Sequence, residues 1–230
     1  MEKFNTDRDG GSAVNIWKNS GTGGNSHIWG KAASCAGILL LGICLSLPSR
    51  AGDQTDIKLT AAEKNKLDTF FSNFSEVAME SFKQNSLSRD TLLKFALDHI
   101  LYNDYKSLKT CDHGNAVIIP LAMVDRVTQR YFGRKVEKDR KPQYQIPAAS
   151  GEAHWFSQIS KLTRVGTDLF RATGVIYVTG SGSTVDAHAN PASYKKSGED
   201  EVDRQATFSA LIKKVGTAKT RYILIEYQCS

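Results

Sequence analysis

Apolar residues recur with helical spacing behind Thr60. The stretch from Thr60 to Glu63 reads TAAE, a capping box in which the threonine hydroxyl accepts from the backbone N–H near Glu63 and the glutamate reaches back. The apolar positions that follow are spaced i, i+3, i+4 and i+7, which is typical of one buried helix face. They are Leu67, Phe70, Phe71, Phe74, Val77, Ala78 and Phe82. The pattern predicts a first long helix that extends to Phe82.

Two further helices are predicted after this one. Ser88 precedes a second apolar stripe, formed by Leu92, Leu93, Ala96, Leu97, Ile100 and Leu101. Residues 116–119 are apolar and predict a short strand. Pro120 fits the first position of a third helix, because that position needs no backbone N–H, and Gly133 fits its end.

From Gln143 onward the pattern becomes that of strands. Residues 169–178 are rich in β-branched and aromatic types, and apolar and polar residues alternate over 205–213. Residues 222–228 predict a last strand, and a slip in the alternation within 153–165 indicates a β-bulge. These features predict an α+β fold, with N-terminal helices packed on a C-terminal four-stranded antiparallel meander.

The first fifty residues have a different character. Residues 1–30 are rich in Gly, Ser and Asn and predict a disordered extension. Lys31, the uncharged run 32–48 and the small residues around Ala51 have the layout of a secretory signal. The same run is alternatively a membrane anchor or a buried helix, since its length lies at the lower edge of what spans a bilayer. We therefore expect segment 31–51 to be a signal or an anchor, followed by a single α+β domain over 52–230.

Composition adds limits to this picture. The 230 residues are 40% hydrophobic and 23% charged, which indicates a packed core and excludes wholesale disorder. The formal net charge is +6, and removal of the residues up to Ala51 would leave +4. Because the basic residues form no long run, nucleic acid is not an expected partner. A membrane is an expected partner only if segment 32–48 is retained.

Two of the four cysteines, Cys111 and Cys229, lie outside the predicted signal. An exported protein meets an oxidising compartment, so a disulfide between them is predicted, with two separate thiols as the alternative. Cys111 is followed by Asp112 and His113, but adjacent side chains rarely face each other, and neither CxxC nor HExxH spacing is present. We therefore expect no metal site and no cofactor.

The connection from Gly180 to Asp203 is much longer than an ordinary hairpin loop, so it is either a solvated insertion or a lid or binding loop. The candidate ligand-binding residues lie on this connection and on the strands beside it. They are Trp155, Tyr177, His188 and Tyr194. We expect His99, within the second helical stripe, to be a partly buried structural histidine. The motifs GxSxG, GxGxxG and the P-loop are absent, so no catalytic residue is assigned.

The order of long helix, second helix, short helix and strands resembles the NTF2-like superfamily and, more loosely, a cystatin-like fold. This resemblance covers about Leu59 to Cys229 and rests on element order without a motif. The segments 130–135 (RYFGRK) and 221–227 (RYILIEY) resemble exported proteins and lipoproteins of bacteria, although the acylated cysteine of the lipoproteins is lacking. NTF2-like proteins include both pocket enzymes and non-catalytic binding modules, so the resemblance implies one of these two classes.

Together these observations predict an exported, non-enzymatic module, periplasmic or secreted, that binds a small apolar ligand or an envelope protein. The concave sheet face and the connection 180–203 would form its site. One alternative is a small pocket enzyme with His188 or His154 as its base. The other is a structural protein of the envelope, anchored in the inner membrane with its domain outside the cytoplasm.

Overall fold

The computed structural model describes residues 54–148, 153–180, 185–194, 202–216 and 220–230, which all belong to the unit Ser49–Ser230. The predicted extension (1–30) and the predicted signal or anchor (31–51) lie outside the described residues. Among those described, no helix is long and apolar enough to cross a membrane.

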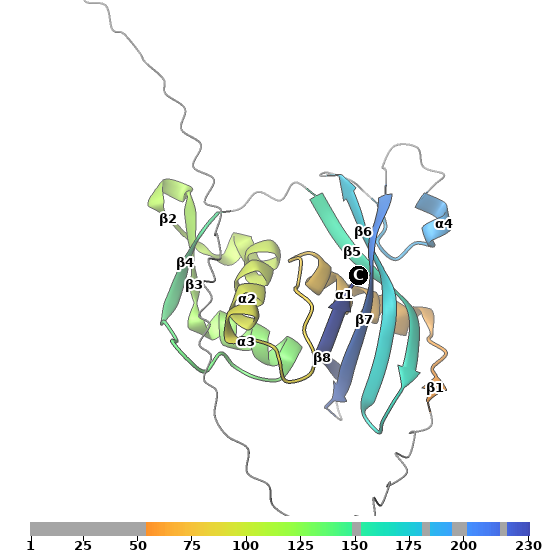
Figure 1. The fold of residues 1–230 in the computed structure, drawn as a ribbon. Coiled ribbons are helices and arrows are strands. Elements are labelled where there is room, and N and C mark those ends of the chain that lie inside the picture. Colours follow the sequence, from red (N-terminus) through yellow and green to blue (C-terminus); the bar gives the residue numbers. More distant parts are fainter. Residues whose placement is uncertain (1–53, 149–152, 181–184, 195–201, 217–219) are drawn as a thin grey trace, which may run out of the picture. The chain divides into compact units, whose positions relative to one another are not determined.

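Figure 1 labels the helices and strands in their order along the chain. The helices are α1 (Ala61–Ser75), α2 (Arg89–Asp104), α3 (Leu121–Phe132) and the single turn α4 (Pro191–Tyr194). The first four strands are short, namely β1 (Thr55–Asp56), β2 (Lys109–Cys111), β3 (Ala116–Pro120) and β4 (Gln143–Pro147). The last four are long, namely β5 (Ala153–Arg164), β6 (Leu169–Gly180), β7 (Val202–Val215) and β8 (Arg221–Cys229).

Helix α1 begins as predicted and ends earlier than predicted. The capping box is present: the Glu63 backbone N–H donates to the Thr60 hydroxyl, and the Glu63 carboxylate accepts from the Thr60 backbone N–H. The helix ends at Ser75, and Ala78 takes a left-handed φ of 47°. The extension to Phe82 is therefore wrong. Phe82 is still buried, because its backbone bonds in both directions with Tyr227 and so covers part of the outer edge of β8.

The other two long helices agree with their sequence signals. The Ser88 hydroxyl caps α2 by accepting from the backbone N–H of Thr91. Gly133 follows α3 with a φ of 70°, a left-handed conformation that suits glycine and ends the helix. Pro120 is the last residue of β3 and lies one position before α3, instead of at the first helical position.

The sheets confirm the α+β class and correct the predicted meander. One sheet has five antiparallel strands in the order β1-β5-β6-β7-β8, and a second has three in the order β2-β3-β4. The four-stranded meander was wrong because β1 and β2, of two and three residues, are too short to produce a periodic signal. The predicted bulge in β5 is present, with a shift of register between Ile159 and Lys161.

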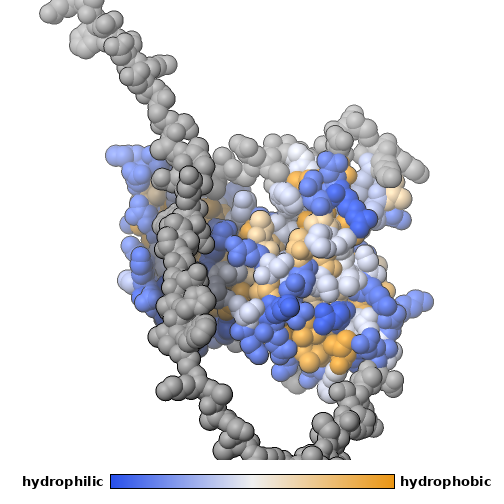
Figure 2. All heavy atoms as spheres, viewed as in Figure 1, coloured by the Kyte–Doolittle hydropathy of each residue, from blue (hydrophilic) through white to orange (hydrophobic). Residues whose placement is uncertain are grey.

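The core is aromatic and fills the space between α1 and the five-stranded sheet, which lie together in Figure 1. Phe71 of α1 contacts Phe208 of β7, with 4.6 Å between ring centroids. Phe74 lies 5.1 Å from Phe95 of α2 and 5.7 Å from Tyr131 of α3. The same core therefore joins all three long helices. Hydrophilic residues cover much of the face seen in Figure 2.

Candidate functional site

Aromatic side chains gather on the outer face of the five-stranded sheet, which we define as the face opposite Phe208 and α1. Phe156 of β5 is paired with Tyr177 of β6, so the two share a face, and their rings stack at 5.4 Å. Tyr194 of α4 packs edge-on against both rings, with centroids 5.9 Å from each. The structure thus brings together two of the predicted site residues, Tyr177 and Tyr194.

A buried amide holds the segment 185–194 on this outer face. Gln158 is only 4% exposed, and its Nε2 donates to the carbonyl oxygens of Ala187 and Ala189 at 2.6 and 2.9 Å. It also lies 2.8 Å from the hydroxyl of Tyr194, which in turn donates to the Asp186 carbonyl at 2.9 Å. Burial, with a smaller contribution from Asp186, raises the pKa of Tyr194 to about 12. The hydroxyl therefore stays protonated and anchors the segment.

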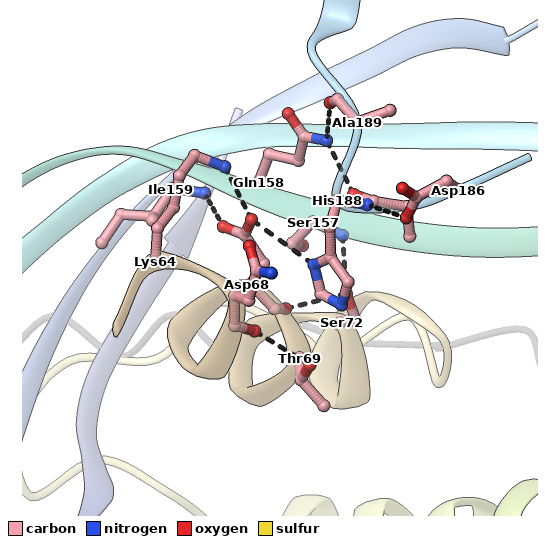
Figure 3. A network of polar contacts seen from close by, with 12 residues as sticks. Lys64, Asp68, Thr69, Ser72, Ser157, Gln158, Ile159, Asp186, His188 and Ala189 are labelled. Atoms are coloured by element: carbon pink, nitrogen blue, oxygen red, sulfur yellow. Dashed lines mark hydrogen bonds and ion pairs between the residues drawn. The ribbon is translucent and has the colours of Figure 1, made fainter. Parts of the chain in front are cut away.

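A second polar group lies where α1 runs beside β5 (Figure 3). Asp68 is fully buried, and its Oδ1 accepts from the backbone N–H of Ile159 at 2.7 Å. Its Oδ2 accepts from Lys64 Nζ at 2.6 Å, and Nδ1 of His188 lies 3.7 Å from the same oxygen. The carboxylate thus connects the helix, the sheet and the segment 185–194.

Serine side chains continue this connection along α1. The hydroxyl of Ser72 accepts from the backbone N–H of Ser157 at 2.9 Å, and the Ser157 hydroxyl donates to Ser75 at 3.1 Å. Asp68, Ser72 and Ser75 are spaced i, i+4 and i+7, so they form one polar stripe on the helix. Strand β1 pairs only with the other end of β5, so it leaves these β5 N–H groups unpaired. The polar stripe on α1 accepts hydrogen bonds from them instead. An unpaired sheet edge would otherwise be open to association with other chains.

The position of His188 favours a structural role over catalysis. A separation of 3.7 Å from Asp68 is longer than a hydrogen bond, and the nearer partners of that carboxylate are Lys64 and Ile159. The backbone N–H of His188 donates to the Asp186 carboxylate at 2.9 Å, which shapes the turn. Its imidazole, with 35% of the side chain exposed, forms an ion pair with Asp68 only when it is protonated.

Trp155 does not join the other predicted site residues. Neighbouring residues of a strand point to opposite faces, so Trp155 points away from the face of Phe156, and it packs against the main core. His154 is exposed on the outer face, with its ring 5.8 Å from Phe156. Of the four predicted ligand-binding residues, His188 and Tyr194 therefore lie on the segment 185–194, Tyr177 packs against Tyr194, and Trp155 belongs to the core.

A polar concavity of about 370 Å³ lies on the sheet next to Gln158. Gln158 is paired with Val175, which lines the concavity, and Val175 is paired with Thr207. Gly174 also forms part of its lining. Most of the lining side chains carry hydroxyl, amide or guanidinium groups, namely Ser160, Thr173, Arg204, Thr207, Ser209, Gln228 and Ser230.

Sequence reasoning missed both Asp68 and Gln158. For Asp68 the available signal was its spacing with Ser72 and Ser75. Three polar residues on one face of a helix indicate a polar contact with another element, besides the contact made by its apolar face. Gln158 gave no comparable signal, because an amide on a strand is ordinarily read as solvent-facing. Its burial depends on the segment that returns to it from 29 residues later in the chain.

The disulfide predicted between Cys111 and Cys229 is not formed, and both residues are free cysteines. Cys111 ends β2 in the three-stranded sheet, whereas Cys229 ends β8 in the five-stranded sheet. The two thiols therefore belong to separate sheets, which the spacing along the chain did not reveal. In the part of the chain that the structure describes, no group of three or more His, Cys, Asp or Glu side chains is placed to hold a metal.

Comparisons with protein families, with curated proteins and with solved structures found no match for this chain.

Proposed function

We propose that this chain is an exported, non-enzymatic binding module whose ligand lies in the polar concavity on the outer face of the five-stranded sheet. The observation that carries the proposal is the concavity of about 370 Å³, whose lining residue Val175 is paired with Gln158, the residue that holds the segment 185–194. Its volume falls within the range of small-ligand sites. The order of elements is compatible with the binding modules of the NTF2-like superfamily, and export rests on the pattern of residues 31–51.

We choose a hydroxylated ligand for the concavity because most of its lining side chains carry hydroxyl, amide or guanidinium groups. The space between α1 and the sheet, where an apolar ligand was expected, is filled by the protein's own rings, such as Phe71 and Phe208 at 4.6 Å. The hydroxyls of Thr173 and Ser209 are half-buried in the concavity and form cross-strand neighbours. Together with Arg204 they offer donors and acceptors of the kind that bind a neutral oligosaccharide.

The geometry gives less support to the alternative of a pocket enzyme. Such an enzyme needs a base within hydrogen-bond reach of its substrate, and His188 and His154 were the candidates. Neither histidine lines the polar concavity, and the described contacts of His188 shape the turn of its own segment.

The proposal is tested by titrating the ¹⁵N-labelled protein with a neutral oligosaccharide, the tetramer of N-acetylglucosamine. We expect amide shifts concentrated around Thr173 and Ser209. Thr173→Val removes one lining hydroxyl at nearly constant shape, and we expect it to weaken binding about fivefold, the value of one neutral hydrogen bond. The matched control is Thr110→Val on the exposed strand β2. Absence of shifts in the concavity, or equal affinity of the two variants, would refute the proposal.

A further inference from the structure

The exposed side of α3 carries an unusual concentration of positive charge. Arg126 and Arg130 are one helical turn apart and both exposed, an arrangement of like charges that destabilises a helix. Among the residues that the structure describes, neither forms an ion pair with an acid. The guanidinium of Arg130 lies over the ring of Tyr131, 5.3 Å from its centroid, so that side chain is partly positioned by packing.

A third arginine reaches the same place from the five-stranded sheet. Arg221 begins β8, and its Nη1 donates to the carbonyl oxygens of Gln129 and Arg130 at 2.8 and 2.9 Å. These carbonyls belong to the last turn of α3, where the C=O groups carry the negative end of the helix dipole. Arg221 therefore occupies groups that would repel an anion, and its own guanidinium is held close to Arg126 and Arg130.

Among the described residues that line the concavity between α3 and β8, one is acidic, and it is already paired. Asp125 Oδ2 accepts from Arg140 at 2.5 Å and lies 3.6 Å from the ammonium of Lys135. Its other oxygen, Oδ1, is buried and has no hydrogen-bond partner among the described residues. Asp125 therefore fixes Arg140 and Lys135 beside the helix, and within the described part of the chain Arg126, Arg130 and Arg221 form no ion pair with a carboxylate.

These side chains line a concavity of about 470 Å³ between α3 and β8, which we call the basic pocket: Ala122, Asp125, Arg126, Gln129, Arg130, Lys135 and Arg221. Four cations against one carboxylate give its lining a formal charge of +3. A concave surface lined by one sign of charge concentrates the field and raises the local concentration of counter-ions. Guanidinium groups also match the oxygens of a phosphate in a two-pronged geometry, which an ammonium does not.

We propose that the basic pocket binds a phosphate-bearing ligand, through the guanidinium groups of Arg126, Arg130 and Arg221. This site is distinct from the polar concavity, which lies on β5–β8 and has Arg204 as its one cationic lining residue. The phosphate belongs either to a soluble compound or to the headgroup of an anionic lipid. The experiment below distinguishes these two sources.

The first measurement is calorimetric titration of the full chain with inorganic pyrophosphate at low ionic strength. We expect saturable binding that weakens as sodium chloride is added, because salt screens exposed charges. The double variant R126Q/R130Q should bind at least about tenfold more weakly. Glutamine has a helix propensity close to that of arginine, so the variant should keep its helical circular dichroism.

A matched control separates a built site from a general effect of net charge. K106Q/K109Q removes the same two charges from exposed positions near the three-stranded sheet, and we expect its affinity to stay within about twofold of the parent. R126K/R130K keeps the charge but loses the two-pronged geometry of the guanidinium groups, so it should bind with intermediate affinity. Equal weakening in both glutamine variants, or no binding by the parent chain, would overturn the proposal.

The second measurement uses vesicles of phosphatidylcholine with and without phosphatidylglycerol. Binding that needs phosphatidylglycerol, is lost in R126Q/R130Q and is displaced by pyrophosphate identifies a lipid headgroup as the source. Binding of pyrophosphate without such vesicle binding identifies a soluble ligand. Failure of the pyrophosphate titration refutes this site and leaves the oligosaccharide proposal for the outer face unaffected.

Discussion

His99 should make the stability of this domain depend on pH in a defined direction. The imidazole is 7% exposed, stacks on Phe95 at 5.6 Å and meets the ring of Tyr131 at 4.9 Å. Its Nδ1 lies 3.1 Å from the amide nitrogen of Asn103, a contact in which an unprotonated Nδ1 accepts. Burial, assisted by the nearby charge of Arg130 and opposed by Asp104, lowers the pKa of His99 from 6.5 to about 4.

The sign of the effect follows from this lowered pKa. Between pH 6.5 and 4 the unfolded chain binds a proton at His99 and the folded chain does not, so the free energy of unfolding falls as the pH falls. The stabilisation is complete above pH 6.5 and is lost as the pH drops toward 4. At about 1.4 kcal/mol per pH unit, the loss is about 2 kcal/mol by pH 5 and about 3 kcal/mol by pH 4.

Glu76 works in the opposite direction over part of this range. Burial raises its pKa from 4.5 to about 6, against a smaller opposing effect of a hydrogen bond from Asn103. Its contribution to stability is complete below pH 4.5 and is lost as the pH rises through 6. Because the carboxyl is partly exposed, we expect this contribution to stay under about 2 kcal/mol.

The variant His99→Phe isolates the histidine. Phenylalanine keeps an aromatic ring between Phe95 and Tyr131 and removes the titrating group, while Asn103 can still donate to the carbonyl oxygen of residue 99. Urea unfolding followed by circular dichroism at several pH values gives the free energy of unfolding of both proteins. Between pH 7 and pH 5 the parent should lose about 2 kcal/mol more than the variant, and the contribution of Glu76 cancels in the comparison.

Two results would refute this reasoning. The first is a parallel pH dependence of the two proteins. The second is an NMR titration in which the His99 ring of the folded parent titrates near its ordinary pKa of 6.5.

Two further changes test other contacts. Gly174→Ala should lower the free energy of unfolding by about 1–3 kcal/mol in urea titrations, because its Cβ would lie 2.3 Å from the Gln158 carbonyl oxygen and 2.4 Å from the Phe208 ring; an unchanged urea midpoint would contradict this close approach. Asp68→Ala should cost about 1–3 kcal/mol by leaving the buried N–H of Ile159 without an acceptor, whereas Asp68→Asn, which keeps an acceptor oxygen, should cost less. Equal losses in the two Asp68 variants would show that the charge matters more than the bond to Ile159.

The sequence predicted those elements whose signals are local. The capping box at Thr60, the cap at Ser88 and the left-handed stop at Gly133 each depend on residues within one or two turns, and all three are present. The bulge in β5 was likewise visible as a slip in the alternation. Such signals arise from backbone geometry and periodicity, which act over a few residues.

Local signals were insufficient where buried apolar residues continue past the end of a helix. The apolar spacing past Ser75 predicted more helix, but the chain turns at Ala78 and places Phe82 against β8. Helical spacing of apolar residues indicates that they are buried, but it does not indicate which part of the chain covers them. The same limit applies to Trp155, whose aromatic side chain belongs to the core instead of the site.

The amino-acid sequence by itself determined the α+β class, the starts of α1 and α2 and the long connection that carries His188 and Tyr194. Only the tertiary structure decided that Asp68 covers the edge of β5, that Gln158 is buried and that the two cysteines lie in separate sheets. The basic pocket is of this second kind, since Arg221 reaches α3 from more than 90 residues away along the chain. Contacts between distant segments depend on how elements pack, and no local periodicity specifies that packing.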